Sequence, residues 1–551
     1  MEKQTFDLII RGASIYDGES DAAYTADVGI QKEKIVEIGD IPKTAGPSVN
    51  GQGLSLMPGI IDIHTHYDAQ LTWDPTLSPS PSMGVTTVVI GNCGFGIAPC
   101  PPETRELMLK NLSVVEGMNL ETLLGGTRWK FESFESYLEF IKQQKPYANV
   151  AALVGHSTVR TAVMGDKASI TKEPSAEEMT EMRNMVDGAI AAGAIGFASS
   201  FSPNHSGFAG KPMPSTIAGD HELMELLAPL KKNKKGVFVS ATGSRATPQY
   251  MENIHKRFGC PSFMVTVLAM HNQTDPELSI RYYENCDGAL ERGHEVYIHA
   301  NPHPLSFDFT LRNPYIFFAH SAFDKIKSAT ADQLKMIYQS SEFKQEFIEN
   351  LKTIKSGALF NGEWKKIELN EIAITTIAKN NGKNPLDWLF EQSLDTTFVA
   401  KLFQNDNKAV AKLLTRPSAV IGLSDAGAHV EFLCDAGFGL FFLEHWVKNT
   451  QSFTLSEGVK KLTSDIAKKY RIKERGKIKP GFFADLVFFD PEKVGLTDLY
   501  KSFDLPSNGS RMLRKPKGVH GVWVNGQRVA AENSPLDLDS GPGKILTEFS
   551  F

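Results

Sequence analysis

The sequence predicts an α/β fold: a (β/α)8 (TIM) barrel, a small β-sandwich domain built from both termini, and an inserted subdomain. Three observations predict it. Apolar strand-like runs alternate with amphipathic helices in the middle of the chain, a pattern typical of a parallel sheet with helical crossovers. Eight such runs end in a polar or small residue, and the two ends of the chain read as short strands separated by turns.

The terminal segments have the pattern of one sheet domain. Leu8-Ile9-Ile10 and Lys34-Ile35-Val36-Glu37-Ile38 lie between Gly- and Asp-containing turns near the start. Near the far end, Gly521-Val522-Trp523-Val524 meets Asn525-Gly526, a strong hairpin-turn pair. Because compact domains often bring their termini together, we expect residues 1–57 and 475–551 to form a composite sheet. The alternative to a composite sheet is that the two terminal segments form separate, unrelated structures.

The middle of the chain supplies the barrel strands, which we expect within residues 58–303 and 415–474. A capping box at Ser175 and Glu178 precedes a helix that stops at Gly193, before the apolar run 194–199. In such barrels, catalytic groups lie where strands meet their following loops. The eight expected strand ends are near His66, Asn92, His156, Ser199, Ala241, His271, His299 and Asp425.

Residues 304–414 do not fit a simple crossover, because the segment is too long and is rich in Phe, Lys and helix-forming residues. We interpret it as an inserted helical subdomain or lid. Within it, residues 332–350 have a helical pattern, while residues 364–369 could form a strand.

Composition excludes some function classes. A chain of 551 residues with net charge −6 and 22% charged residues has no bias towards binding polyanions, so nucleic acid is not an expected partner. The start of the sequence lacks the features of a signal peptide, and no apolar run is long enough to cross a bilayer. We therefore expect no membrane partner and a cytoplasmic location. Five scattered cysteines do not suggest a disulfide framework. Oligomeric state is left open.

A chelating pair of histidines follows the first barrel strand. Side chains two apart on a strand point to one face, so His64 and His66 can place two imidazoles on one ion while Thr65 points away. Asp425 follows the last apolar run, where a carboxylate beside a metal-bound water can accept its proton and pass it to a leaving nitrogen. An aspartate capping the next helix is the simpler alternative. His271 and His299 also close apolar runs; each could be an ordinary core histidine, but together they favour metal ligation.

Over most of its length the chain resembles the amidohydrolase superfamily and, within it, the D-aminoacylase (N-acyl-D-amino-acid deacylase) branch. The resemblance rests on the run from Met57 to His66, on Gly84 to Phe95 with its Gly91-Asn92-Cys93-Gly94 motif, and on Ser424-Asp425. Residues 476–487 resemble the strand opening with which superfamily members close their sheet domain.

The resemblance implies a zinc-dependent enzyme holding one or two ions. Many superfamily members bridge two metals with a carbamylated lysine, but the fourth strand here has none; Cys93 resembles the cysteine that the deacylase branch uses instead. A thiolate suits zinc well. By the same resemblance His271 and His299 hold a metal, zinc-activated hydroxide attacks the amide carbonyl, and Asp425 shuttles the proton. His156 could donate to the developing oxyanion, or make an ordinary buried hydrogen bond.

The chain differs from the D-aminoacylase branch in a residue that would bind the substrate. D-aminoacylases carry an arginine shortly after the catalytic aspartate to bind the substrate carboxylate, and residues 426–436 contain none. Arg245 could replace it from another loop, because a guanidinium grips a carboxylate bidentately; a surface role is the alternative. His271 and His299 also fall one strand later than the superfamily's usual fifth and sixth positions, so one counted strand could lie outside the barrel, with the true seventh in the insert.

These features predict hydrolysis of a linear amide in a small-molecule substrate, with deacylation of an N-acyl amino acid as the leading hypothesis and N-acyl-D-amino acids as a candidate substrate class. Cyclic amide opening or deamination on the same barrel is a second hypothesis. A third is a non-catalytic relative that keeps the barrel for binding or assembly, although the full set of candidate ligands argues against it.

Overall fold

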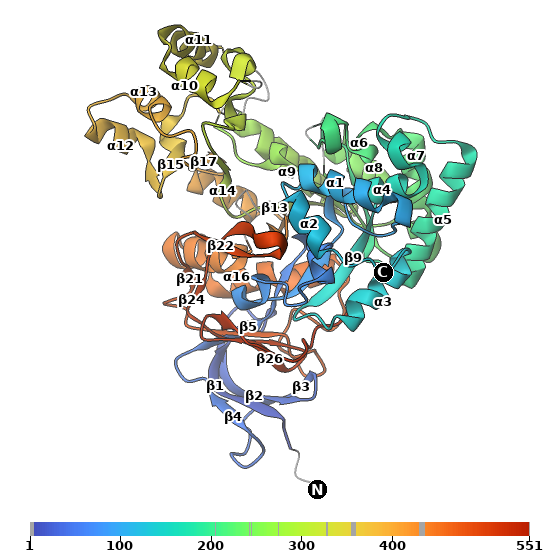
Figure 1. Ribbon diagram of the computed structural model, residues 1–551. Helices are drawn as coiled ribbons and strands as arrows, with labels where there is room; N and C mark the ends of the chain where they lie inside the picture. The colour runs from blue at the N-terminus through green and yellow to red at the C-terminus, as the bar shows by residue number, and fades with distance from the viewer. Residues whose placement is uncertain are drawn as a thin grey trace. The chain divides into compact units, whose positions relative to one another are not determined.

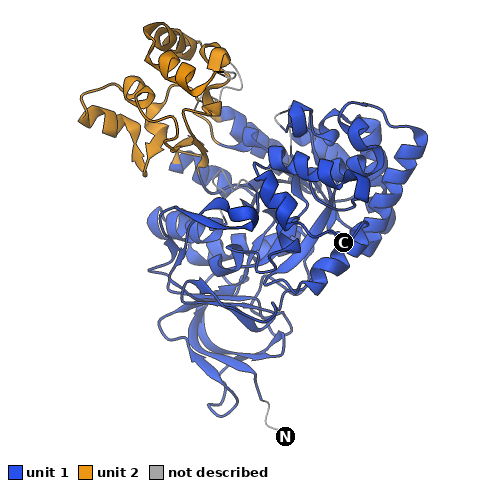
Figure 2. Cartoon of the chain, in the orientation of Figure 1, with its two compact units in different colours: residues 1–270, 277–303, 407–551 blue, residues 271–276, 304–406 orange. Residues whose placement is uncertain are grey.

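The computed structural model describes residues 5–203, 205–241, 243, 245–273, 275–326, 329–353, 360–428 and 436–549. Two compact units make up the chain (Figure 2). The first contains Met1–Met270, Glu277–His303 and Asn407–Phe551, and the second contains His271–Pro276 and Pro304–Asp406. The first unit holds the barrel and the terminal sheet; the second is the insert.

A parallel eight-stranded barrel sheet lies at the centre of the first unit (Figure 1), in the order β18-β13-β12-β11-β10-β9-β8-β6. Each strand pairs with the next one formed along the chain, as in a (β/α)8 barrel. The strands are β6 (Ile60–Asp62), β8 (Val85–Ile90), β9 (Asn149–Gly155), β10 (Gly196–Ser200), β11 (Val237–Ala241), β12 (Ser262–Val265), β13 (Val296–Ala300) and β18 (Ala419–Ile421).

The first and last strands close the barrel after a short interruption in each. Beyond β6 the chain continues as β7 (His64–Thr65), and beyond β18 as β19 (Leu423–Ala426); these two segments pair in parallel. The Ile63 amide donates to the Gly422 carbonyl at 2.8 Å, and the His66 amide donates to the Ala426 carbonyl at 2.8 Å. The barrel is therefore complete at the edge that carries the candidate metal ligands.

All eight counted strands belong to this barrel, so the alternative that places one outside it, with the seventh in the insert, is wrong. Strand β12 pairs with β13, and β13 pairs with β18. Consequently His271 follows the sixth strand and His299 lies in the seventh. The fifth strand, β11, ends at Ala241 without a histidine.

Helices cover the outside of the barrel, and their starts follow the sequence signals. In α5 the Ser175 side chain caps the helix and Glu178 returns the bond, while Gly193 at φ 109° ends it, as predicted. Within the described residues no helix has the length and apolar character that crossing a membrane requires. The covering helices include α1 (Arg105–Val115), α3 (Phe134–Gln143), α4 (His156–Met164), α5 (Ala176–Ala192), α7 (Asp220–Asn233), α8 (Pro248–Phe258), α9 (Pro276–Glu291), α14 (Asn407–Leu414), α16 (Leu455–Leu462) and α17 (Ser464–Lys469).

Strands from both ends of the chain form one sheet, in the order β27-β26-β25-β20-β5-β1-β2-β3 with β4 beside β1. The junction is the antiparallel pair β5–β20, and the turn at Asn525-Gly526 joins β25 to β26 as predicted. The strands are β1 (Leu8–Ile15), β2 (Tyr24–Gln31), β3 (Lys34–Gly39), β4 (Ser48–Asn50), β5 (Ser55–Pro58), β20 (Leu486–Phe489), β25 (Val519–Val524), β26 (Gln527–Ala531) and β27 (Ser534–Pro535).

A buried polar network ties this sheet to the barrel. Arg475 forms an ion pair with Asp485, and both side chains are at most 3% exposed. Asp485 also accepts from the Asn525 amide at 2.8 Å and from the Asn149 side chain at 3.1 Å. Asn149 begins the barrel strand β9, and Asn525 lies in the β25–β26 turn of the terminal sheet. The Asp485 carboxylate therefore bonds to both the barrel and the terminal sheet.

The second unit combines helices with a four-stranded sheet, in the order β14-β17-β15-β16, around an aromatic core. The helical stretch expected at residues 332–350 is two helices that meet at Ser340, whose side chain caps the second. Its elements include β14 (Leu305–Phe309), β15 (Ile367–Leu369), β16 (Ile372–Ala373), β17 (Phe398–Phe403), α10 (Ala331–Gln339), α11 (Ser341–Lys352), α12 (Ile374–Asn380) and α13 (Pro385–Phe390).

Replacing Asp485 with alanine should lower the free energy of unfolding by about 3–5 kcal/mol, because it leaves the buried Arg475 charge without its partner. Urea denaturation would measure this. Glu19→Ala, which breaks an exposed pair with Lys477, is the control and should cost less than about 1 kcal/mol. Equal losses in the two variants would contradict the role given to the network.

Candidate metal centre

His64 and His66 converge on Asp425 at the closed edge of the barrel. The Nε2 atom of His64 lies 3.2 Å from Asp425 Oδ1, and the Nε2 atom of His66 lies 3.6 Å from the same oxygen. Both imidazoles are buried, whereas the Asp425 side chain is 32% exposed. Pairing of β7 with β19 therefore gathers two imidazoles and one carboxylate that is still open to solvent.

Cys93 completes the cluster from the loop after the second strand. Its Sγ atom lies 3.5 Å from His64 Nε2, and burial raises the pKa of the free thiol to about 11. The loop turns sharply, because Gly91, Cys93 and Gly94 all have φ between 56° and 80°. Left-handed backbone is uncommon for a cysteine and concentrates at functional sites.

The donor set fits a zinc ion. His64, His66 and Cys93 offer ligand atoms that all lie within 4.8 Å of one another. Zinc bonds of about 2.0–2.3 Å in a tetrahedron place neighbouring ligand atoms about 3.3–3.8 Å apart. The separations of His64 Nε2 from Cys93 Sγ and from Asp425 Oδ1, 3.5 and 3.2 Å, are close to that range. Two imidazoles with a thiol are also typical zinc ligands.

The position of Asp425 depends on an unusual backbone conformation and on its neighbour. Asp425 has φ 53°, in the left-handed region. Just before it, the Ser424 hydroxyl donates to Asp62 and accepts from the Ala426 amide at 2.9 Å. Asp62 also accepts from the His64 amide at 3.3 Å. These bonds connect the first and last strands directly beside the cluster.

Besides Asp62, two buried carboxylates near the cluster were not among the candidates from the sequence. Glu116, which follows α1, has Oε1 3.5 Å from His66 Nδ1, and Asp68 accepts from the Gly91 amide at 3.1 Å. Burial raises the pKa of Glu116 to about 7 and that of Asp68 to about 6. Burial alone would lower the pKa of His66. The nearby Glu116 carboxylate and hydrogen bonds to Asp425 and Cys93 outweigh this effect, so the pKa of His66 is raised. Asp68 could have been proposed as a site residue from the sequence, because it lies two positions after His66. No local sequence pattern marks Glu116 as a site residue.

His299 lies behind His64 rather than beside Cys93. Its Nδ1 atom is 3.2 Å from His64 Nδ1, and its Nε2 atom is 2.7 Å from the hydroxyl of Tyr470. Burial lowers the pKa of His299 well below its ordinary value, and His64 lowers it further. Both ring nitrogens thus face protein groups.

His156 belongs to a separate buried network. Its Nδ1 atom lies 2.8 Å from Ser199 Oγ and its Nε2 atom lies 2.8 Å from Glu222 Oε1. Arg160 also pairs with Glu222. Burial would raise the pKa of Glu222, but His156 and Arg160 together hold it below its ordinary value. With both nitrogens engaged, His156 has none directed at a substrate in this conformation.

Arg245 is held by a carboxylate of the protein. Its guanidinium bonds to Asp220, donates to the Ala218 carbonyl at 2.6 Å and lies over the Phe201 ring. Tyr250 donates to the same Asp220 oxygen at 2.7 Å. The structure therefore gives Arg245 an internal partner instead of a position in the cluster.

His271 belongs to the second unit. Its amide donates to Gln404 Oε1 at 2.8 Å, and its carbonyl accepts from the Gln404 amide at 3.0 Å. Its metal-binding role stays a prediction from its place at the end of the sixth strand. Residues 429–435, with most of the arginine-free stretch after Asp425 and with Cys434, lie outside the described residues.

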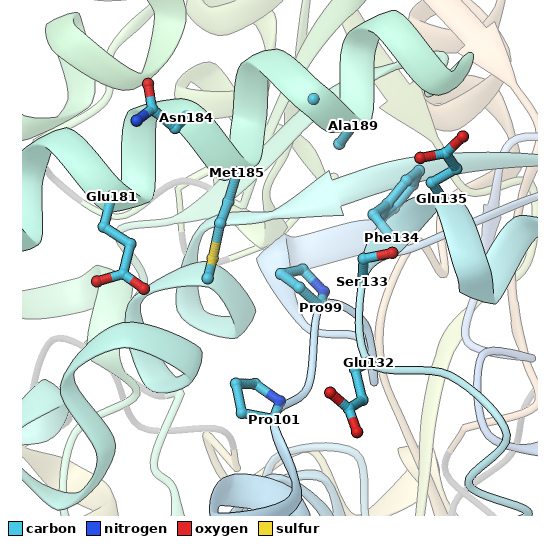
Figure 3. Close-up of a pocket in the computed structure, with 11 residues that line it drawn as sticks. Pro99, Pro101, Glu132, Ser133, Phe134, Glu135, Glu181, Asn184, Met185 and Ala189 are labelled. Atoms are coloured by element: carbon cyan, nitrogen blue, oxygen red, sulfur yellow. The ribbon is translucent and has the colours of Figure 1, made fainter.

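A hollow of about 490 Å³ lies elsewhere, between α3 and α5 (Figure 3). Figure 3 shows Phe134 and Met185 among its lining residues and the carboxylates of Glu132, Glu135 and Glu181 around it. It contains none of the candidate site residues. The hollow is therefore not part of the metal site.

A closed parallel barrel with a His-His-Cys cluster at its strand ends defines the class of protein: a metal-dependent barrel enzyme. The amidohydrolase family pattern matches residues 49–331 and 376–530, and the chain belongs to that family. It is therefore a metal-dependent amidohydrolase, which acts on carbon–nitrogen bonds other than peptide bonds.

Individual relatives point to one branch. The chain is 28% identical to a D-aminoacylase of Alcaligenes xylosoxydans xylosoxydans, over 97% of this chain and 96% of that one. It is 27% identical to an N-acyl-D-glutamate deacylase of the same organism, over 99% and 97%. The crystal structure of a D-aminoacylase superposes with a TM-score of 0.67 at 25% identity, covering 98% of this chain and all of the other.

Replacing Cys93 with serine should weaken zinc binding by roughly 100-fold or more, since even groups that only orient a ligand are worth about 10–100-fold. Competition with a chromogenic chelator would measure the affinity. The thiolate-to-metal absorption band of the Co²⁺-substituted protein should disappear as well. Cys286→Ala, at a buried cysteine packed on Met264, is the control. An unchanged band in Cys93→Ser would exclude Cys93 as a ligand.

Proposed function

We propose that this protein is a zinc-dependent hydrolase of linear amides that deacylates N-acyl amino acids. One observation carries the proposal: His64, His66 and Cys93 present clustered donor atoms, with the partly exposed Asp425 in contact with both imidazoles. Three protein ligands with one solvent-facing side is the arrangement of catalytic rather than structural zinc sites.

In this proposal His64, His66 and Cys93 hold the metal, and His271 is a further ligand by its place at the end of the sixth strand. A bound zinc ion supplies Lewis acidity, which polarises an amide carbonyl and lowers the pKa of water. Asp425 accepts a proton from water through its carboxylate and returns it to the leaving nitrogen. Its exposure matters, because the group must reach both solvent and substrate.

The relatives support N-acyl-D-amino acids as the substrate class, since the similar proteins are a D-aminoacylase and an N-acyl-D-glutamate deacylase. The amino acid and the acyl group are left open. The arginine that the branch places after its aspartate is missing from residues 426–436, and Arg245 is paired with Asp220.

Assay of the purified, zinc-loaded protein would test this function. N-acetyl-D-amino acids should release free amino acid faster than their L-enantiomers, while cyclic amides and aminated heterocycles remain intact. Preferential opening of a cyclic amide, or deamination, would replace the proposal with the second hypothesis. A protein that binds no zinc and turns over none of these compounds would instead be a non-catalytic relative.

Asp425→Asn should lower kcat by about 10²–10⁴-fold, because the amide cannot accept and return the proton. Zinc content should stay near that of the wild type, since His64, His66 and Cys93 remain. Steady-state kinetics together with elemental analysis would check both expectations. Asp21→Asn, an exposed carboxylate paired with Lys460, serves as the control. Full activity in Asp425→Asn would refute the proton shuttle.

A further inference from the structure

We propose that His299 is a positioning residue for His64, anchored in turn by Tyr470, and does not itself hold the metal. The inference rests on the proposed function, because it assigns a role around the metal site. It replaces the ligand role that the sequence predicted for His299 with one that its contacts support.

The two ring nitrogens of His64 face different groups. Nε2 lies 3.5 Å from Cys93 Sγ and 3.2 Å from Asp425 Oδ1, within the metal cluster. Nδ1 lies 3.2 Å from His299 Nδ1, and the two rings meet edge to face at 87°. Because the two nitrogens of an imidazole point away from each other, His299 contacts the side of His64 that does not face Cys93.

This contact fixes where the protons lie once His64 binds a metal through Nε2. Its Nδ1 must then carry the proton and donate to Nδ1 of His299. Because Nδ1 of His299 accepts this bond, His299 carries its own proton on Nε2 and donates it to the Tyr470 oxygen at 2.7 Å. No proton is gained or lost along this series of hydrogen bonds, and each histidine is held in a single tautomer.

Packing holds the hydrogen-bonded series His64–His299–Tyr470 rigid. Tyr470 follows α17 and is fully buried, its ring 4.4 Å from the Phe263 ring. Phe263 also contacts His299, with ring centroids 5.7 Å apart. Groups that orient a metal-binding histidine through its second nitrogen are typically worth 10–100-fold in metal affinity.

Three variants test the role, with zinc affinity and the Co²⁺ absorption spectrum as readouts. Tyr470→Phe removes the anchor, His299→Leu removes the acceptor, and His299→Asn keeps an acceptor near the position of Nδ1. We expect the first two to weaken zinc binding by about 10–100-fold and His299→Asn by no more than about threefold, all without a change in the shape of the Co²⁺ spectrum.

Tyr338→Phe is the matched control, since Tyr338 is a buried tyrosine that donates to the Leu311 carbonyl in the second unit. Zinc affinity in Tyr470→Phe equal to that control would overturn the inference, as would a Co²⁺ spectrum of His299→Asn that has lost an imidazole ligand. If the wild type bound no zinc at all, the proposed function itself would fail. Zinc bound equally well by every variant would refute only the role of His299.

Discussion

Closure of the barrel between its first and last strands is the constraint on which the site depends. Two backbone bonds, from Ile63 to Gly422 and from His66 to Ala426, hold β7 against β19. These segments lie more than three hundred residues apart in sequence, yet they carry the imidazoles and the carboxylate of the cluster. The same pairing that removes the free edges of the sheet therefore assembles the chemistry.

The positions of Cys93 and Asp425 depend on local backbone conformation as well as on the barrel. Cys93 and Asp425 have φ near 55°, each at the point where a strand gives way to its loop. Position 94 requires glycine, because the Cβ of any other residue there would come within 2.9 Å of the Ala198 carbonyl oxygen. The cysteine loop thus packs directly against the fourth strand, which offers no metal-binding side chain of its own.

Features governed by local periodicity could be predicted from the sequence. The barrel strands, the capping box at Ser175, the hairpin turn at Asn525 and the pairing of His64 with His66 each depend on residues a few positions apart. The surroundings of His299 and Glu116 could not be predicted, because Tyr470 lies 171 positions from its partner and the Glu116–His66 contact depends on how a loop folds back. Strand-end position alone does not distinguish a ligand from a residue that supports one.

The junction between β5 and β20 constrains the order of events during synthesis. Strand β5 precedes every barrel strand and β20 follows them all, so β5 leaves the ribosome when only one of its two neighbours, β1, has been made. Its four residues are all buried in the finished sheet. The N-terminal strands can pair with one another early, but the junction that joins them to the C-terminal strands can form only after the barrel strands have been made.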